Sequence, residues 1–174
     1  MNDKSIKNKV IVSNNKIQNI NIDSKNLFLP VGILDPVGKQ LNPLTGLKYK
    51  NIYYNPNNSI DKTNFTYSSL AKIWSNFPMY QLKETAIKTI YNNQVILVVS
   101  GTGSGKTVLT PKFALHTLNY KGKIVITNPK RLPSMENAKF AAKTLDVKLG
   151  DSVGVKYRGS DSSLYSKTKT KLLY

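Results

Sequence analysis

The sequence predicts an α/β domain built on a parallel sheet that is covered by helices on both faces. An apolar, strand-like run at residues 95–99 leads straight into a glycine-rich loop and then into a helical pattern. A second apolar run, a second helical pattern and a third apolar run follow. Strands that alternate with helices in this way pair in parallel through right-handed crossovers. The 174 residues suffice for one such domain, alone or with an extension.

Two segments precede this pattern. Residues 1–26 are rich in Asn and Lys and lack sustained periodicity, which predicts a flexible leader. Residues 27–77 are punctuated by Pro, Gly and Asn and are predicted to form a loop-rich N-terminal arm. One helical face is expected in that arm, because four apolar residues recur there at helical spacing: Leu70, Ile73, Trp74 and Phe77. Trp74 is expected to pack in the core rather than to read a nucleobase.

The predicted α/β domain occupies residues 78–174. Its first helix is expected to start near Pro78, because proline suits the first turn of a helix. The predicted elements, in order, are a helix at 80–91, a strand at 95–99, a helix at 107–119, a strand at 124–126, a helix at 134–145 and a strand at 153–157. Residues 164–174 are expected to form or approach a further strand, which would leave an unpaired edge at residues 172–174 and a mobile C-terminal tail.

The loop after the first of these strands has the sequence Ser-Gly-Thr-Gly-Ser-Gly-Lys-Thr at residues 100–107. This is a phosphate-binding loop in its required context, with a strand before it and a helix after it. Its glycines let backbone N–H groups turn toward a phosphate, and the helix adds the positive end of its dipole. Lys106 is placed to reach the β- and γ-phosphates, and the Thr107 hydroxyl to bind Mg²⁺. The chain is therefore expected to bind a nucleoside triphosphate, although Ser100 stands where the motif usually has glycine.

A second candidate site follows the next predicted strand, at Thr127-Asn128-Pro129-Lys130-Arg131. Ligands of open α/β sheets bind at the carboxyl ends of the strands. Two adjacent cations at such a place suit a phosphodiester backbone, and the N-terminus of the following helix would assist them. A solvated basic turn is the alternative that the spacing leaves open.

The composition favours a polyanionic partner, since 26 basic and 9 acidic residues give a net charge of +17. General overuse of Lys and Asn is the alternative explanation. Cysteine is absent and His116 is the single histidine, which excludes a disulfide framework and a Cys/His metal cluster. No apolar run reaches the ~18–20 residues of a membrane span, and the N-terminus lacks the apolar stretch of a signal peptide. We therefore expect an intracellular, soluble protein without a membrane partner.

The motifs together resemble the DEAH-box type of superfamily 2 helicases. The loop, a proline five residues after its lysine (Pro111), the TNPKR segment and the stretch LDVKLGDSVGVKYRG occur in the order and at the spacing of that family. The resemblance covers roughly residues 77–173 and implies a partial RecA-like P-loop NTPase domain, the N-terminal part of the first of two such domains. The front segment GILDPVGKQLNPLTGLKY is similar to helicase-like proteins of large nucleocytoplasmic DNA viruses.

The resemblance also implies roles for individual residues, with ATP and Mg²⁺ as cofactors. The residues that would hold the triphosphate are Gly101, Thr102, Gly103, Ser104, Gly105 and Lys106. Lys106 would act as the catalytic cation, Thr107 would hold Mg²⁺, and Gln81 would touch adenine. The residues that would contact single-stranded RNA or DNA are Pro129, Lys130, Arg131 and Arg158. Family members carry Gly-Glu where this chain has Ser100 and Gly101, and Gln and Arg where it has Asn128 and Lys130; lysine pairs phosphate but lacks the fork of arginine.

One catalytic feature of that family is absent. A helicase holds Mg²⁺ and aligns water with an Asp-Glu pair at the end of an apolar strand. The acids that follow Thr107 end no apolar run: they are Glu136, Asp146, Asp151 and Asp161. We therefore expect an N-terminal helicase fragment that is inactive alone, with the C-terminal part as a possible separate chain. The alternatives are a non-catalytic nucleotide- or nucleic-acid-binding module and a small P-loop kinase; a total of two arginines argues against the kinase, which needs an arginine-bearing lid.

Overall fold

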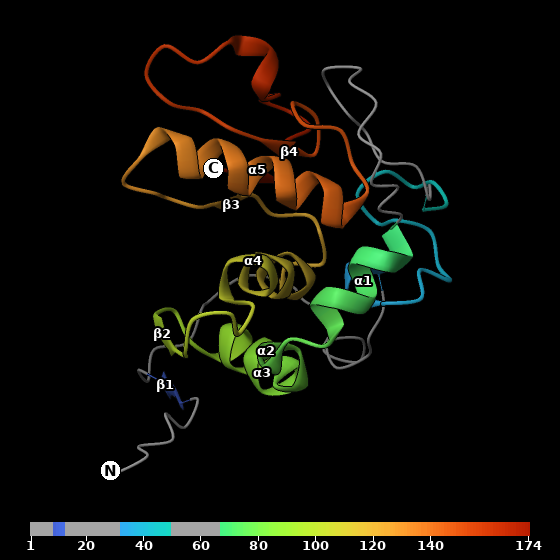
Figure 1. Cartoon of the computed structure of the whole chain (residues 1–174), viewed down its shortest axis with the longest axis vertical. Helices are drawn as coiled ribbons and strands as arrows, with labels where there is room; N and C mark the ends of the chain where they lie inside the picture. The colour runs from blue at the N-terminus through green and yellow to red at the C-terminus, as the bar shows by residue number, and fades with distance from the viewer. Residues whose placement is uncertain (1–8, 13–31, 50–66) are drawn as a thin grey trace.

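The computed structural model describes residues 9–12, 32–49 and 67–174. Its helices are the 3₁₀ helix η2 (Gly32–Leu34), α1 (Tyr67–Ser75), α2 (Pro78–Gln81), α3 (Lys83–Asn92), α4 (Lys106–Thr117), α5 (Arg131–Leu145) and the 3₁₀ helix η3 (Ser162–Leu164). Its strands are β1 (Lys9–Val12), β2 (Ile96–Val99), β3 (Ile124–Val125), β4 (Val153–Gly154) and β5 (Leu172–Leu173). Helix α4 lies in the middle of the molecule, with α2 and α3 on one side and α5 with the strands β3 and β4 on the other (Figure 1).

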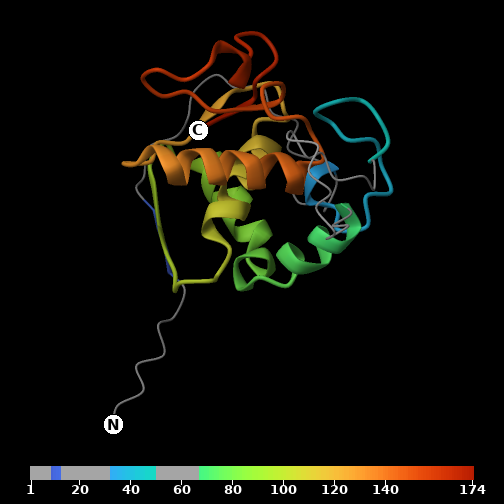
Figure 2. The same ribbon diagram turned by 45° about the horizontal axis from the view of Figure 1, so that its top comes forward.

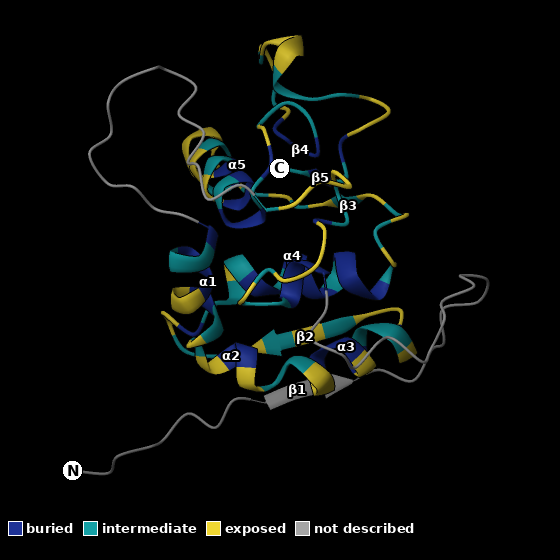
Figure 3. Ribbon diagram, turned by 90° about the vertical axis from the view of Figure 1, so that its right-hand side faces the viewer, coloured by how far each residue is buried: buried dark blue, intermediate teal, exposed yellow. Residues whose placement is uncertain are grey.

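A parallel three-stranded sheet confirms the predicted α/β class. Its strand order is β3-β5-β4, and both neighbouring pairs run parallel. Helix α4 lies between this sheet and the layer formed by β2 and α3 (Figure 3). Alternation of strand and helix in the sequence thus produces the expected architecture of a partial RecA-like domain.

Strand β2, which leads into the glycine-rich loop, does not join the parallel sheet. Among the described residues it pairs with β1 alone, antiparallel, with Lys9 opposite Val99. The exposed fractions of Val95, Leu97 and Val99 are 66%, 57% and 43%. The prediction that this strand is a covered member of the parallel sheet is therefore wrong. A fully buried strand needs neighbours on both edges and cover on both faces, and the described residues do not supply them.

Strand β1 falls within residues 1–26, which the sequence predicted to be a flexible leader. Its four residues run alongside β2. The rest of that segment lies outside the described residues, and so do residues 27–31 and 50–66 of the predicted arm. The boundaries that divide the chain into residues 1–26, 27–77 and 78–174 stay predictions.

The C-terminal residues lie at the centre of the parallel sheet, not at an unpaired edge. Leu172 in β5 is opposite Ile124 on one side and Val153 on the other. The backbone N–H of Tyr174 donates to the carbonyl of Gly154, and the side chain of Tyr174 is 5% exposed. The C-terminus lies next to α5 (Figure 2). The expectation of an open edge at residues 172–174 is wrong, because the chain returns between two strands that come earlier in the sequence.

The described part of the arm belongs to the same hydrophobic core as the α/β elements. Ile33 and Leu34 in η2 are fully buried within it. The hydroxyl of Tyr80 donates a 2.8 Å hydrogen bond to the carbonyl of Leu34. The side-chain amide of Asn42, which is 1% exposed, donates a 2.8 Å hydrogen bond to the carbonyl of Leu145 at the end of α5. These bonds tie residues 32–49 to α2 and to α5.

The predicted helices occur with shifted boundaries. Helix α1 matches the apolar pattern in the arm, and Trp74 is 1% exposed, which confirms that it packs in the core. Ile73 is 48% exposed and Phe77 lies beyond the end of α1. Of the four residues predicted to form the apolar face, only Leu70 and Trp74 are therefore buried residues of this helix. The single helix predicted at residues 80–91 is divided into α2 and α3 at Leu82.

Candidate nucleotide and nucleic-acid sites

The loop between β2 and α4 has a backbone that requires glycine at two positions. Gly103 and Gly105 have φ angles of 79° and 94°, which other residues rarely adopt. A side-chain carbon at Gly105 would lie 2.7 Å from the ring of Phe77, whereas one at Gly101 or Gly103 would meet no atom within 4 Å. Gly105 is therefore fixed by packing as well as by its φ angle. The space beside Gly101 and Gly103 is open to a ligand.

Lys106, the first residue of α4, folds its side chain back over the loop. Its Nζ donates hydrogen bonds of 2.6 Å to the carbonyl of Ser100 and 2.8 Å to the carbonyl of Gly101. The hydroxyl groups of Ser100 and Ser104 lie 2.7 Å apart beneath it. The ammonium thus sits at the N-terminus of a 12-residue helix, where the helix dipole disfavours a cation. An anion at this place would satisfy both the ammonium and the N–H groups of the first helical turn, which have no intrahelical partner.

The other two residues predicted at this site lie on the surface around the loop. Thr107 is exposed in the first turn of α4. Gln81 is exposed at the end of α2, and the backbone N–H of Met79 in that helix donates a 3.1 Å hydrogen bond to the carbonyl of Ser104. The structure therefore brings the helix of Gln81 into contact with the loop. Tyr80, its neighbour, is buried and bonded to Leu34, so it has a structural role.

None of the four acids after Thr107 directly follows the last residue of a described strand. Glu136 forms a 2.9 Å ion pair with Lys139 inside α5. Asp146 ends α5 in the left-handed conformation, and Asp151 lies in the turn before β4. Asp161 caps η3, where hydrogen bonds from Ser163 hold the pKa of this carboxyl below its ordinary value.

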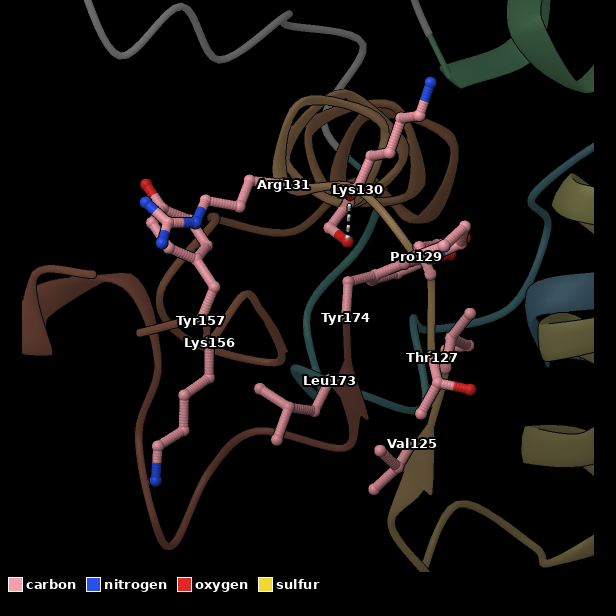
Figure 4. Close-up of a pocket in the computed structure, with 12 residues that line it drawn as sticks. Val125, Thr127, Pro129, Lys130, Arg131, Lys156, Tyr157, Leu173 and Tyr174 are labelled. Carbon is pink, nitrogen blue, oxygen red and sulfur yellow. Dashed lines mark hydrogen bonds between the residues drawn. The ribbon is translucent and has the colours of Figure 1, made fainter. Parts of the chain in front are cut away.

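A cavity of about 290 Å³ opens where the three parallel strands end (Figure 4). The residues that line it come from the ends of β3 and β5, from the segments that follow β3 and β4, and from the start of α5: Val125, Ile126, Thr127, Asn128, Pro129, Lys130, Arg131, Ser134, Lys156, Tyr157, Leu173 and Tyr174. The structure thus brings Pro129, Lys130 and Arg131 together at the strand ends. Arg158 is exposed in the loop after β4 and does not line the cavity.

Residues 127–131, which we call the basic segment, are held in place by the start of α5. Lys130 is the N-cap residue of α5, and its carbonyl accepts a 3.1 Å hydrogen bond from the Ser134 hydroxyl. The guanidinium of Arg131 lies over the ring of Tyr157, 5.7 Å from its centre, while the side chain of Lys130 extends away from that ring (Figure 4). Tyr157 and Lys156 were not predicted as site residues. Their signal in the sequence was their place directly before Arg158.

The sequence has helicase relatives over most of its length. Over 144 residues, 83% of this chain, it is 42% identical to a protein of Acanthamoeba polyphaga mimivirus that carries the name of an ATP-dependent RNA helicase. The chain is homologous to ATP-dependent RNA helicases. Over 97 residues, 55% of this chain, it is 38% identical to the ATP-dependent RNA helicase HrpA of Borreliella burgdorferi. These relatives confirm the predicted resemblance to DEAH-like helicases and to proteins of large DNA viruses.

This helicase homologue spans only part of each relative, 19% of the mimivirus protein and 12% of HrpA. No protein-family model matches it. In the part of the chain that the structure describes, every helix is too short or too polar to cross a membrane.

Proposed function

We propose that this helicase homologue binds ATP through residues 100–107 and that the complete protein couples ATP hydrolysis to movement along a nucleic-acid strand. The observation that carries the proposal is the position of Lys106, whose ammonium lies in a glycine-rich loop at the N-terminus of α4. The names of the relatives support the use of ATP and favour RNA as the strand.

In this proposal the triphosphate is held by backbone N–H groups of residues 101–106 and by the Lys106 ammonium. Lys106 exchanges the carbonyl oxygens of Ser100 and Gly101 for phosphate oxygens, and so neutralises negative charge at the β- and γ-phosphates. The Thr107 hydroxyl is a ligand for Mg²⁺, and Gln81 is a contact for adenine. When bound, Mg·ATP supplies the phosphoanhydride bond whose hydrolysis drives the complete enzyme.

The nucleic acid is proposed to bind at the basic segment. Pro129 shapes the turn, and Lys130 and Arg131 pair with phosphates, with Arg158 as a further contact. Residues 78–174 contain 16 basic and 5 acidic residues, which supports an anionic partner for this part of the chain. Phosphate contacts of this kind read no sequence, so binding should be nonspecific.

A further partner in this proposal is the remaining helicase sequence, on the same chain or on a separate one. The relatives are several times longer than the region that they share with this chain. The apolar side chains of Leu97 and Val99 are exposed on β2, which pairs with β1 alone among the described strands. Added helicase sequence that covers β2 should reduce hydrogen exchange there.

A non-catalytic nucleotide- or nucleic-acid-binding module is the second candidate. It is favoured by the positions of the four acids after Thr107, none of which directly follows the last residue of a described strand. Such a module would bind Mg·ATP and a strand but would not turn ATP over. A helicase fragment that lacks its catalytic acid would also hydrolyse ATP slowly when it is by itself.

Phosphate release with and without single-stranded RNA, measured beside the unfolding temperature with and without Mg·ATP, tests the proposal. We expect ATP to raise the unfolding temperature and turnover to stay far below the rates of about 1–10³ s⁻¹ that are typical of enzymes. Absence of a thermal shift would refute the ATP site. RNA-stimulated turnover at ordinary rates would show that this chain supplies its own catalytic acid.

A further inference from the structure

We infer that the cavity at the ends of β3, β4 and β5 receives a nucleobase of the bound single strand, stacked on the ring of Tyr157. This inference rests on the proposed nucleic-acid binding at Lys130 and Arg131 and adds a contact to the base. The proposed phosphate contacts explain how a strand is attracted and positioned. They leave unexplained why the same place has a hollow with an aromatic wall.

The walls of the cavity suit a flat, largely apolar group. Val125, Leu173 and Pro129 contribute apolar surface, and the Val125 side chain is 62% exposed. Tyr157 and Tyr174 contribute aromatic rings. At about 290 Å³ the cavity lies at the lower limit of the range for small-molecule sites, which suits one base rather than a larger ligand.

The charges around the cavity favour an anionic ligand. Lys130, Arg131 and Lys156 line it, and none of its twelve lining residues is acidic. A nucleotide combines the two properties that these walls favour, a flat ring and an attached phosphate. An acidic peptide would satisfy the cations but would leave the aromatic wall without a matching group.

The contact between Arg131 and Tyr157 provides a way to expose the face of the tyrosine ring to a base. The guanidinium lies 5.7 Å from the centre of the Tyr157 ring. A phosphate offers this guanidinium a charge-assisted, bidentate partner, which is stronger than its contact with the ring. When Arg131 turns to a phosphate, the ring face becomes free for a base. Every base has a π-face, so stacking adds affinity without sequence preference.

The side-chain amide of Asn128 adds a hydrogen-bond donor at the cavity. Asn128 lines the cavity, and its Nδ2 is buried without a hydrogen-bond partner among the described residues. A buried donor without a partner is costly, and native proteins usually satisfy it. Because this atom is closed off from solvent, an acceptor on the edge of a base would supply the partner once the amide turns toward the cavity.

The test compares two short single-stranded RNAs of equal length, one with bases and one in which every base is removed. Their affinities are measured by fluorescence anisotropy over a range of salt for the wild type, Tyr157→Leu and Tyr157→Phe. Tyr91→Leu, in α3, is the matched control because it removes a tyrosine ring far along the chain from this cavity. Thermal unfolding of each variant establishes that it is folded.

We expect the wild type to bind the base-bearing strand about tenfold more tightly than the abasic strand. Tyr157→Leu should lose this preference, Tyr157→Phe and Tyr91→Leu should keep it, and the salt slope should be the same in all four proteins. If the wild type binds both strands equally with a normal salt slope, the base contact is wrong and the phosphate contacts stand. If neither strand binds, both the proposed function and this inference fail. Retention of the preference in Tyr157→Leu overturns the role of Tyr157.

A tryptophan at position 157 gives a readout that does not depend on overall affinity. Trp74 is the one tryptophan of the chain and is 1% exposed, so its fluorescence is a constant background. In Tyr157→Trp the added fluorescence should be quenched by the base-bearing strand and not by the abasic strand. A free nucleoside monophosphate at the same concentration should leave it unchanged. Quenching by the monophosphate but not by the strand would identify a free nucleotide as the ligand and refute a strand contact.

Discussion

The ammonium of Lys112 lies 5.0 Å from the centre of the Trp74 ring, and both side chains are buried in the core. Its Nζ donates a 2.9 Å hydrogen bond to the carbonyl of Thr144 near the end of α5. The lysine thus connects α4 to α1 and to α5. Burial lowers the pKa of Lys112 to about 7.

This buried lysine should make the protein more stable as the pH rises from about 7 to about 10. In that range the unfolded chain keeps the proton of Lys112 while the folded protein releases it, so the free energy of unfolding rises by up to about 1.4 kcal/mol per pH unit. Below pH 7 both states hold the proton, and the group adds no pH dependence. Lys112→Met should remove the rise, and Lys88→Met, at an exposed lysine of α3, should keep it. Urea unfolding across this pH range is the measurement.

Above about pH 10 the free energy of unfolding should fall, not rise, as the pH increases. Burial raises the pKa of Tyr80 to about 12 and raises the pKa values of Tyr67, Tyr120 and Tyr174 still further. These phenols stay neutral in the folded protein while the unfolded chain ionises, so stability is lost as the pH rises beyond their ordinary pKa. The same urea series should therefore show a maximum near pH 10. A monotonic rise through pH 11 would contradict the burial of these tyrosines.

Lys106→Ala should abolish the stabilisation by Mg·ATP. The side chain supplies the cation of the loop, and its loss leaves the backbone N–H groups without that charge. For the wild type, a ligand at 100 times its dissociation constant stabilises the fold by about 2.7 kcal/mol. The variant should show no shift in calorimetry, while Lys88→Ala should shift like the wild type. An unchanged shift in Lys106→Ala would mean that ATP binds elsewhere.

Replacement of both Lys130 and Arg131 by Ala should weaken the salt dependence of RNA binding. Each phosphate contact to a single strand contributes about −0.7 to the slope of log K against log salt. In the double variant the slope should therefore be less steep by the amount expected for about one to two phosphate contacts. A double variant at Lys72 and Lys88 removes the same charge from exposed positions on α1 and α3 and should keep the slope. Equal slopes in both double variants would identify the basic segment as a solvated turn.

Asn42→Ala should destabilise the fold by about 1–3 kcal/mol, because it leaves the carbonyl of Leu145 buried without its side-chain donor. The same side chain accepts a 3.0 Å hydrogen bond from the backbone N–H of Leu44. Asn76→Ala, at an exposed position after α1, should change stability little. Chemical denaturation gives the free energy of unfolding of each variant. Equal free energies of unfolding in the two variants would mean that residues 32–49 lie outside the cooperative core.

The amides of Leu172 and Tyr174 should exchange slowly with deuterium. They donate to the carbonyls of Ser152 and Gly154 in the middle of the parallel sheet. Hydrogen-exchange protection close to that of α4 would support this position, since central strands open only with the whole domain. Rapid exchange throughout residues 164–174 would instead support the mobile tail that the sequence suggested.

Local sequence determined the glycine-rich loop and the elements around it. The N-terminus of α4, the positive φ angle at Gly103 and the fold-back of Lys106 all depend on residues within a few positions of each other. Such features follow from backbone preferences and from the ends of a helix, which a sequence pattern records. The order of strands and helices, and the buried place of Trp74, were predictable for the same reason.

Tertiary structure alone decided how distant segments meet. The sequence could not indicate that β5 enters between β3 and β4, that β2 pairs with β1, or that Tyr157 stands beside Arg131. It also gave no sign that Lys112 is buried against Trp74, because its charge predicts exposure. Strand pairing and burial depend on contacts between residues far apart in the chain. A local pattern of apolar residues is compatible with several such arrangements, and only packing selects among them.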